Sequence, residues 1–238
     1  MRQKVFRVGV LSTADAPYLG YLLNSLATVS GIEVVVLFDR NSLDEKQKVI
    51  ELERTEGKLP PIPLHNLKIA PACYFVGNHN GLKCIELVKH LSLDVLINGG
   101  TPRILKADTL GSTPLGVLNC HPGLLPEFRG CTCVEWALYL NQSVGSSVHL
   151  MSEKIDEGPL VLSEAIEILP DDQYSDIRTR VYLQAPELYT KSIVLLRDGL
   201  EISTLQIPLG GQYYDVIPQN KFNQVLANLN DKKTDEPD

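Results

Sequence analysis

The sequence contains no apolar run that approaches the roughly 20 residues needed for a membrane-spanning helix. The amino-terminal stretch, Met1–Gly20, places basic residues ahead of a short apolar run, but polar residues interrupt that run after about one strand length. We therefore interpret it as a first strand rather than a signal peptide. The expected location is the cytoplasm, and no membrane partner is expected.

Clusters of basic residues are also missing. The 238-residue chain has a net charge of −7, whereas nucleic-acid binding requires Lys and Arg side chains gathered against phosphates. This composition argues against a nucleic-acid partner. A hydrophobic content of 44% and a charged content of 21% are typical of a globular protein with a substantial core.

Cysteine pairs with the spacing of a zinc knuckle are absent as well. The chain has five cysteines, an odd number, so we expect reduced thiols rather than a disulfide framework. Cys131 and Cys133 are separated by one residue instead of two, and no second pair follows. We therefore expect no metal site.

What the sequence does contain is an alternation of apolar, β-branched runs and amphipathic segments. Strands are expected at residues 5–11, 32–38, 73–76, 93–97 and 160–168, and helices at 17–30, 41–56, 80–90 and 176–196. This alternation predicts an α/β fold, a Rossmann-like, mostly parallel twisted sheet with helices on both faces. Such sheets bind ligands beyond the carboxyl ends of their strands, where Asn98–Arg103 and Asn119–His121 fall.

The carboxyl-terminal part changes character. Pro186 must kink or divide the helix expected there. Beyond Gly199 the pattern suggests a hairpin followed by a short helix at Lys221–Leu229. We divide the chain into a catalytic domain (1–200), a small appendage made of a hairpin and a short helix (201–230) and a disordered tail (231–238).

Three polar residues at the ends of expected elements could carry chemistry. Asn119 and His121 lie two apart on an extended segment, so their side chains share a face. An amide and an imidazole can together stabilise the oxygen of a carbonyl under nucleophilic attack. Asp156, in a later loop, could raise the pKa of His121 and take a proton from an attacking amine. For each residue alone, a structural role in a turn or strand end is the simpler interpretation.

The order of motifs from Gly116 to Gly158 resembles the catalytic segment of the folate-dependent formyltransferases, which move a formyl group from 10-formyltetrahydrofolate to an amine. The matching pieces are Asn119-Cys120-His121-Pro122, Leu124-Leu125-Pro126, Phe128-Arg129-Gly130, Val148-His149 and Asp156-Glu157-Gly158. The match is strongest over residues 93–168 and compatible over 1–200. The resemblance implies that Asn119, His121 and Asp156 are catalytic, that 10-formyltetrahydrofolate is the co-substrate and that no metal is required.

The resemblance also implies contacts for the two substrates. The pterin would be held by the segment Gly100, Thr101, Pro102, Arg103, Ile104 and Leu105, largely through its backbone. A surface salt bridge is the alternative role for Arg103. The acceptor would lie near Ser12, Thr13, Arg129, Gly130 and His149. A structural role for His149 is at least as well founded.

The acceptor itself is expected to be a small-molecule amine. The glycinamide ribonucleotide formyltransferases have a glycine-rich phosphate loop where this chain has Ser12–Pro17, without glycine and with Asp15. The methionyl-tRNA formyltransferases add a sizeable basic domain. The layout is therefore most similar to the sugar N-formyltransferases, whose acceptors are nucleotide-linked amino sugars. A glycinamide ribonucleotide formyltransferase-like enzyme, a 10-formyltetrahydrofolate hydrolase and a non-catalytic folate- or nucleotide-binding protein stay open, as does a homodimer.

Overall fold

The computed structural model describes residues 5–207 and 210–231. The strands are β1 (Phe6–Ser12), β2 (Ile32–Asp39), β3 (Ala72–Gly77), β4 (Val95–Asn98), β5 (Val117–His121), β6 (Phe128–Gly130), β7 (Gly145–Leu150), β8 (Leu160–Ala165) and β9 (Gln212–Tyr214). The α-helices are α1 (Leu19–Leu26), α2 (Glu45–Thr55), α3 (Leu82–His90), α4 (Ala107–Leu110), α5 (Cys133–Tyr139), α6 (Tyr174–Arg197) and α7 (Gln219–Asp231). The predicted disordered tail lies outside the described residues, apart from its first residue.

The main sheet has seven strands in the order β3-β2-β1-β4-β5-β7-β8. The strands from β3 to β5 in this order pair in parallel, and β7 and β8 then pair antiparallel. This arrangement confirms the predicted α/β fold with a mostly parallel sheet. It also places the carboxyl ends of β1, β4 and β5 side by side. The polar segments Asn98–Arg103 and Asn119–His121 lie at the ends of β4 and β5.

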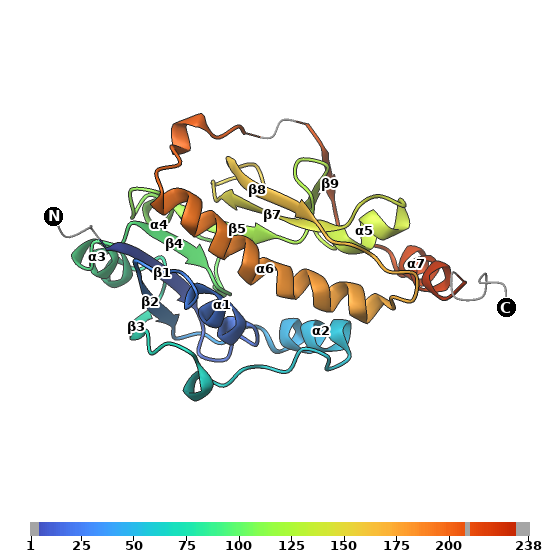
Figure 1. Cartoon of the computed structure of the whole chain (residues 1–238), viewed down its shortest axis with the longest axis horizontal. Helices are drawn as coiled ribbons and strands as arrows, with labels where there is room; N and C mark the ends of the chain where they lie inside the picture. Colours follow the sequence, from blue (N-terminus) through green and yellow to red (C-terminus); the bar gives the residue numbers. More distant parts are fainter. Residues whose placement is uncertain (1–4, 208–209, 232–238) are drawn as a thin grey trace.

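The sheet is covered on both faces, and a hydrophobic core lies against each face. Val8 and Val10 of β1 face one core, which α1 and α6 cover on the near side of Figure 1. Leu11 faces the other core, where Cys84 and Val88 of α3 pack. Alternate residues of one strand thus serve opposite layers, as the pleat of a strand requires.

Of the two outcomes expected at Pro186, a kink or a division of the helix, the structure excludes the second. Helix α6 runs without interruption from Tyr174 to Arg197, with Pro186 inside it, so the proline does not divide the helix. The carbonyl oxygen of Pro186 accepts hydrogen bonds from the hydroxyls of Ser25, at 3.1 Å, and Thr190, at 2.9 Å. The Ser25 contact and the burial of the proline tie this part of α6 to α1, so packing stabilises the helix where proline supplies no backbone donor.

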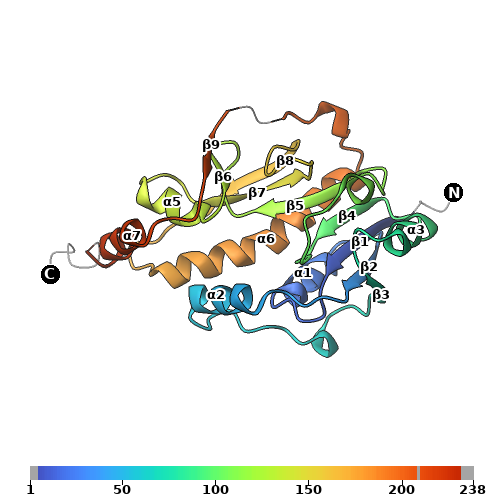
Figure 2. The ribbon, with the colours of Figure 1, turned by 180° about the vertical axis from the view of Figure 1, so that it is seen from behind.

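The carboxyl-terminal appendage corrects another expectation. Instead of forming a hairpin of its own, β9 pairs in parallel with β6, and α7 packs against α5. Figures 1 and 2 show α7 at the end of the molecule opposite α3. Trp136 fixes the connection between β9 and α7, because its indole N–H donates to the carbonyl of Asp215 at 2.8 Å. The appendage is therefore part of one continuous structure with the segment after β5.

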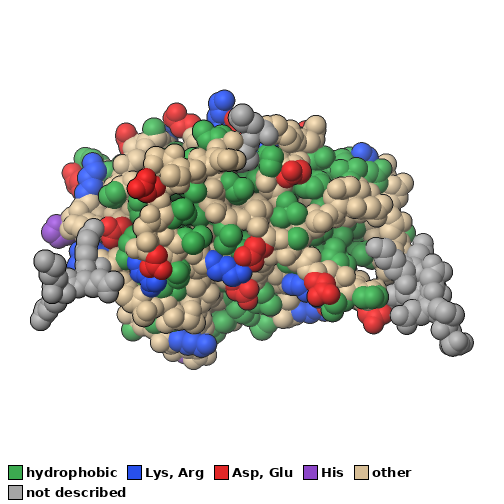
Figure 3. Space-filling view, turned by 45° about the horizontal axis from the view of Figure 1, so that its top comes forward, with side chains coloured by type: hydrophobic (Ala, Val, Ile, Leu, Met, Phe, Trp, Pro, Cys, Tyr) green, Lys and Arg blue, Asp and Glu red, His purple; other side chains and the backbone are tan. Residues whose placement is uncertain are grey.

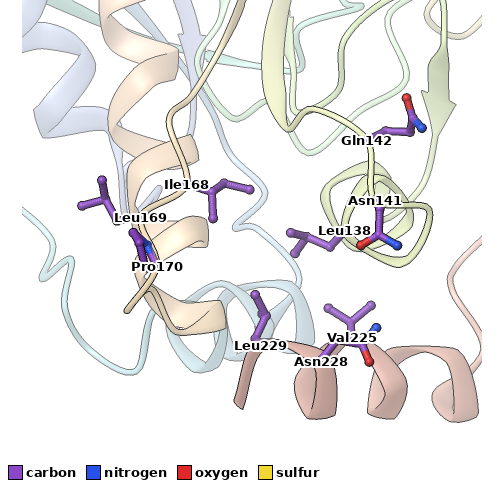
Figure 4. A pocket seen from close by; sticks show the side chains of 9 residues that line it. All are labelled: Leu138, Asn141, Gln142, Ile168, Leu169, Pro170, Val225, Asn228 and Leu229. Carbon is purple, nitrogen blue, oxygen red and sulfur yellow. The ribbon is translucent and has the colours of Figure 1, made fainter. Parts of the chain in front are cut away.

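A cavity of about 500 Å³ lies between α5, the segment before α6 and α7. Figure 4 shows its lining, which is Leu138, Asn141, Gln142, Ile168, Leu169, Pro170, Val225, Asn228 and Leu229. These side chains are apolar or neutral amides, so the cavity has no group that can donate or accept a proton in catalysis.

The surface carries mixed charge. On the face shown in Figure 3, Lys and Arg side chains lie among Asp and Glu side chains. Within the described residues, no helix is both long enough and apolar enough to span a bilayer. All five cysteines are free thiols.

Candidate active site

Strands β4 and β5 and the loop after β7 bring Asn98, Asn119, His121 and Asp156 to one end of the sheet. Asn98 and His121 are the last residues of β4 and β5, which pair in parallel. β7 pairs with β5, and Asn119 lies directly opposite His149. The sheet therefore brings together the three predicted catalytic residues, which are separated by up to 37 positions in the sequence.

Asp156 is the centre of this arrangement. Its Oδ2 lies 3.4 Å from Nδ1 of His121, and its Oδ1 lies 3.6 Å from Nε2 of His149. The backbone N–H of Gly130 donates to Oδ2 at 3.0 Å. Asp156 has a positive φ of 54°, a conformation that is uncommon outside glycine. The carboxylate is thus buried and held by the Gly130 N–H, with the imidazole rings of His121 and His149 beside it.

The ionisation states follow from burial and these contacts. Burial raises the pKa of Asp156, but the hydrogen bond with His149, the charge of His121 and the Gly130 N–H together lower it below its usual value. Burial lowers the pKa of His121, and Asp156 only partly opposes this effect. At neutral pH, Asp156 is an ionised carboxylate beside a neutral imidazole. Asp156 thus acts on the pKa of His121 in the expected direction, upward, but burial lowers this pKa by more, so the net shift is downward.

The imidazole of His121 is fixed on its other side. Its Nε2 lies 2.8 Å from the carbonyl oxygen of Phe128 and donates to it. In the neutral ring this leaves Nδ1, the atom that faces Asp156, without a proton. The His121–Asp156 pair can therefore accept one proton between the two side chains.

Asn119 is oriented by a residue to which the sequence assigned no role. Nδ2 of Asn98 donates to Oδ1 of Asn119 at 2.8 Å, so the NH₂ group of Asn119 points the other way, 3.2 Å from Nε2 of His149. Asn98 is itself held, because its Oδ1 accepts from the N–H of Thr101 at 3.1 Å. A neutral, oriented NH₂ group is suited to donate to a developing oxyanion.

Tyr189 of α6 supports the same strand ends. Its hydroxyl donates to the carbonyl of Asn98 at 2.8 Å and accepts from the N–H of Cys120 at 2.7 Å. No sequence motif identifies this residue. Cys120, between Asn119 and His121, packs against the core under α6. Burial raises the pKa of its thiol to about 12, which excludes a thiolate nucleophile at neutral pH.

The segment predicted to hold a pterin lies beside Asn119, but its side chains have different roles. Thr101 Oγ1 lies 2.6 Å from Nδ1 of the buried His79. Arg103 donates through Nη2 to Asp39 at 2.8 Å, so its guanidinium forms the ion pair that was the alternative to ligand binding. Ile104 is 89% exposed, whereas Leu105 is buried. Gly100 and Pro102 contribute backbone, and Gly100 has a positive φ of 99°.

The residues predicted near the acceptor are distributed in two groups. Ser12 and Thr13 are buried, and Oγ of Ser12 donates to the carbonyl of Gly99 at 2.7 Å, so this hydroxyl supports the loop. Arg129 donates to Glu157 at 2.9 Å and to the carbonyl of Gly211 at 3.3 Å. It therefore ties β9 to the loop of Asp156.

A cavity of about 360 Å³ opens beside Asn119. Its lining is Ala16, Pro17, Tyr18, Leu19, Leu22, Leu43, Glu51, Asn98, Gly99, Gly100, Thr101, Asn119, Cys120, Tyr182, Ala185, Pro186 and Tyr189. We call it the tyrosine cavity. It connects the predicted catalytic amide with the β1–α1 connection and with α6. Among the described residues, no three His, Cys, Asp or Glu side chains are grouped as metal ligands would be.

Residues 7–193 match the family model described as formyl transferase. The chain belongs to this family. The methionyl-tRNA formyltransferase of Syntrophus aciditrophicus (strain SB) is 26% identical over 171 residues, which cover 69% of this chain and 54% of that protein. The chain spans about half of that relative, and 14% of a trifunctional purine biosynthetic protein that it also matches.

Solved structures show the same formyl transferase fold. A 4-N formyltransferase from Francisella tularensis superposes with a TM-score of 0.60 at 20% identity, over 90% of this chain and 78% of that chain. Glycinamide ribonucleotide transformylase 1 from Symbiobacterium toebii gives a TM-score of 0.60 at 22% identity, over 87% of this chain and 96% of that chain. At such identities the likeness concerns the fold.

Proposed function

We propose that this formyl transferase moves a formyl group from 10-formyltetrahydrofolate to the primary amine of a small molecule. The observation that carries the proposal is the contact of Asp156 with His121 beside the oriented amide of Asn119. An ionised carboxylate, a neutral imidazole and a fixed amide donor are the groups that acyl transfer to an amine requires.

The residues near this centre fit a folate. Ile104, on the loop after β4, and Ile155, before Asp156, are 89% and 62% exposed. Exposed apolar side chains on two loops that flank a polar centre offer walls for a flat ring. The backbone of residues 99–105 offers donors and acceptors to its edge. When bound, the folate supplies the formyl group.

The protein's own groups would then manage charge and protons. Asn119 donates from its NH₂ group to the formyl oxygen as the acceptor nitrogen bonds to the formyl carbon. The His121–Asp156 pair accepts the proton that this nitrogen loses. The pair returns the proton to the departing folate nitrogen as the bond to the formyl carbon breaks. One proton moves in and one moves out, so the site ends as it began.

We favour a nucleotide-linked amino sugar as the acceptor. The β1–α1 connection argues against an acceptor that binds there through a phosphate. This connection contains the carboxylate of Asp15, and the ammonium group of Lys48 is already paired with it. A sugar N-formyltransferase from Shewanella sp FDAARGOS_354 shares the fold over 94% of this chain and 87% of that chain, with a TM-score of 0.56 at 17% identity, which agrees with this choice. A glycinamide ribonucleotide acceptor is the second candidate, and the similarity to the Symbiobacterium toebii enzyme keeps it in the test.

The test is to mix the protein with 10-formyltetrahydrofolate and candidate amines and to measure tetrahydrofolate and the formamide product together. We expect the two to form in equal amounts and only with an acceptor. His121→Asn should lower the rate strongly, whereas His90→Asn, at the exposed end of α3, should not. Tetrahydrofolate without an acceptor would indicate a hydrolase, and folate binding without turnover would indicate a binding protein.

A further inference from the structure

The lining of the tyrosine cavity is unlike a phosphate site. Of its 17 residues, none is Lys, Arg or His, and the carboxylate side chain among them belongs to Glu51. A phosphate or diphosphate inside the cavity would therefore lack a cation and would lie near a negative charge. The aromatic rings in the same lining are compatible with an arriving ammonium group.

The nearest cations are engaged elsewhere. Lys48, on α2, pairs with Asp15 and with Glu45, the latter at 2.7 Å. Arg178, on α6, is buried behind the cavity wall, and its Nη2 donates to the hydroxyl of Tyr182 at 2.8 Å. Neither side chain lines the cavity.

The backbone at the start of α1 does not replace these cations. The N–H of Leu19 donates to the carbonyl of Ala16 at 3.3 Å, and the N–H groups of Tyr21 and Leu22 donate to the carbonyl of Tyr18 at 3.1 and 3.3 Å. These donors bond to the chain itself. The glycine here, Gly20, has a packing role, because a Cβ at this position would lie 2.6 Å from Cβ of Ile62.

Aromatic rings form the walls instead. The rings of Tyr18 and Tyr182 lie 4.7 Å apart, and the hydroxyl of Tyr189 is bonded to the strand ends. Burial raises the pKa of Tyr18 far above its usual value, so this ring stays neutral. Neutral aromatic rings pack against carbon surfaces and attract ammonium groups through their faces.

We infer that the tyrosine cavity binds the amine-bearing part of the acceptor as an uncharged ring or chain and excludes phosphate attached close to the amine. This inference rests on the proposed function. A nucleotide-linked amino sugar meets the requirement when its sugar lies in the cavity and its diphosphate lies outside. An acceptor whose phosphate must enter the cavity does not.

Matched pairs of amines test the inference. With 10-formyltetrahydrofolate saturating, kcat/KM would be measured for ethanolamine against O-phosphoethanolamine and for glucosamine against glucosamine 1-phosphate, in which the phosphate is attached next to the carbon that bears the amine. We expect the member of each pair without phosphate to be preferred by at least about tenfold, because the phosphate meets no cation. Equal or better turnover of the phosphorylated members would overturn the inference and leave formyl transfer standing.

A pair of variants tests the effect of a positive charge in the cavity. Leu43 is a partly buried lining residue just before α2, and Leu43→Lys supplies the missing cation, with Leu43→Gln as the neutral control. The Lys variant should reduce the preference for the amines without phosphate by about tenfold relative to the Gln variant. An unchanged preference would count against the inference. Absence of formamide from every amine, with folate bound, would end both proposals.

Discussion

The catalytic centre and the tyrosine cavity share a wall at Asn119, yet they are built from different materials. In the centre, Asp156 and His121 are each fixed by a backbone group, the N–H of Gly130 and the carbonyl of Phe128. In the cavity, the rings of Tyr18 and Tyr182 pack against each other. The comparison indicates that backbone groups fix the catalytic side chains, whereas side chains form the walls of the cavity proposed to receive the acceptor. Tyr189 belongs to both regions, because its hydroxyl also bonds to the ends of β4 and β5.

The largest expected effect comes from Asp156→Asn. This variant keeps the size of the side chain but removes the negative charge that allows the His121–Asp156 pair to accept a proton. We expect kcat to fall by roughly 10²–10⁴-fold, the usual contribution of a positioned acid or base. Steady-state kinetics with a fixed amine would measure it, and folate affinity should change little. A fall in affinity with unchanged kcat would assign Asp156 to binding instead.

The next prediction tests whether the appendage supports the centre. Gly211 has a φ of 75°, and a Cβ there would lie 1.6 Å from the carbonyl oxygen of Pro126. Gly210 also has a positive φ, of 86°, but its Cβ would meet nothing within 4 Å. Gly211→Ala should therefore lower the free energy of unfolding by about 1–3 kcal/mol more than Gly210→Ala, as overpacking does.

The same pair should separate in activity. β9 holds β6, and β6 supplies the Gly130 N–H that fixes Asp156. Denaturant titration would give the stabilities. Under the same conditions, kcat should be lower for Gly211→Ala than for Gly210→Ala. If both variants lost stability but kept full kcat, β9 would be an anchor for α7 and nothing more.

Much of the fold could be predicted because local pattern and tertiary structure agree. Β-branched runs such as Ile32–Phe38 are buried on both faces of the sheet, which is the environment that such runs favour. Pro186 and β9 could not be predicted. A proline is tolerated in α6 only because α1 packs beside it, and β9 finds its partner about 80 residues away. Both depend on contacts that no short window contains.

The candidate site shows the same division. Asn119, His121 and Asp156 carried a motif, and the sheet brings them together as expected. Their supports carried none: Asn98 orients Asn119 across two strands, and Tyr189 reaches the strand ends from α6. Arg103 was expected near a pterin because of its position in the loop. Its partner, Asp39, lies at the end of β2, so only the folded sheet shows that the guanidinium is already paired.

A smaller effect is expected from the support of Asn119. Asn98→Ala removes the donor to Oδ1 of Asn119, so the amide can rotate and present its oxygen to the substrate. One hydrogen bond of this kind contributes about 1 kcal/mol, so kcat should fall by roughly 5–10-fold. The KM for the amine should stay near its original value, and Asn66→Ala, an exposed change in the short 3-10 helix Leu64–Asn66, should affect neither. A change in KM alone would show that Asn98, which also lines the tyrosine cavity, acts on acceptor binding rather than through Asn119.

The smallest effect concerns pH and belongs to the centre rather than the cavity. Burial lowers the folded-state pKa of both His121 and His79 below the usual 6.5. Below pH 6.5 the unfolded chain therefore binds protons that the folded chain does not, so this stabilisation is complete above that pH and is lost as the pH falls. The lowered pKa of Asp156 acts in the same direction, but only below about 3.8.

The free energy of unfolding should therefore be nearly constant from pH 8 to 7 and should decline below pH 6.5, by at most about 1.4 kcal/mol per pH unit for each histidine. Urea titrations at pH 7.5 and 5.5 would measure the decline. His121→Asn should make it shallower, whereas the exposed His65→Asn should leave it unchanged. The raised pKa of Tyr18 keeps that ring neutral throughout, so Tyr18→Phe should not alter the slope. If Tyr18→Phe changed this pH dependence and His121→Asn did not, the titrating group would belong to the tyrosine cavity and not to the catalytic centre.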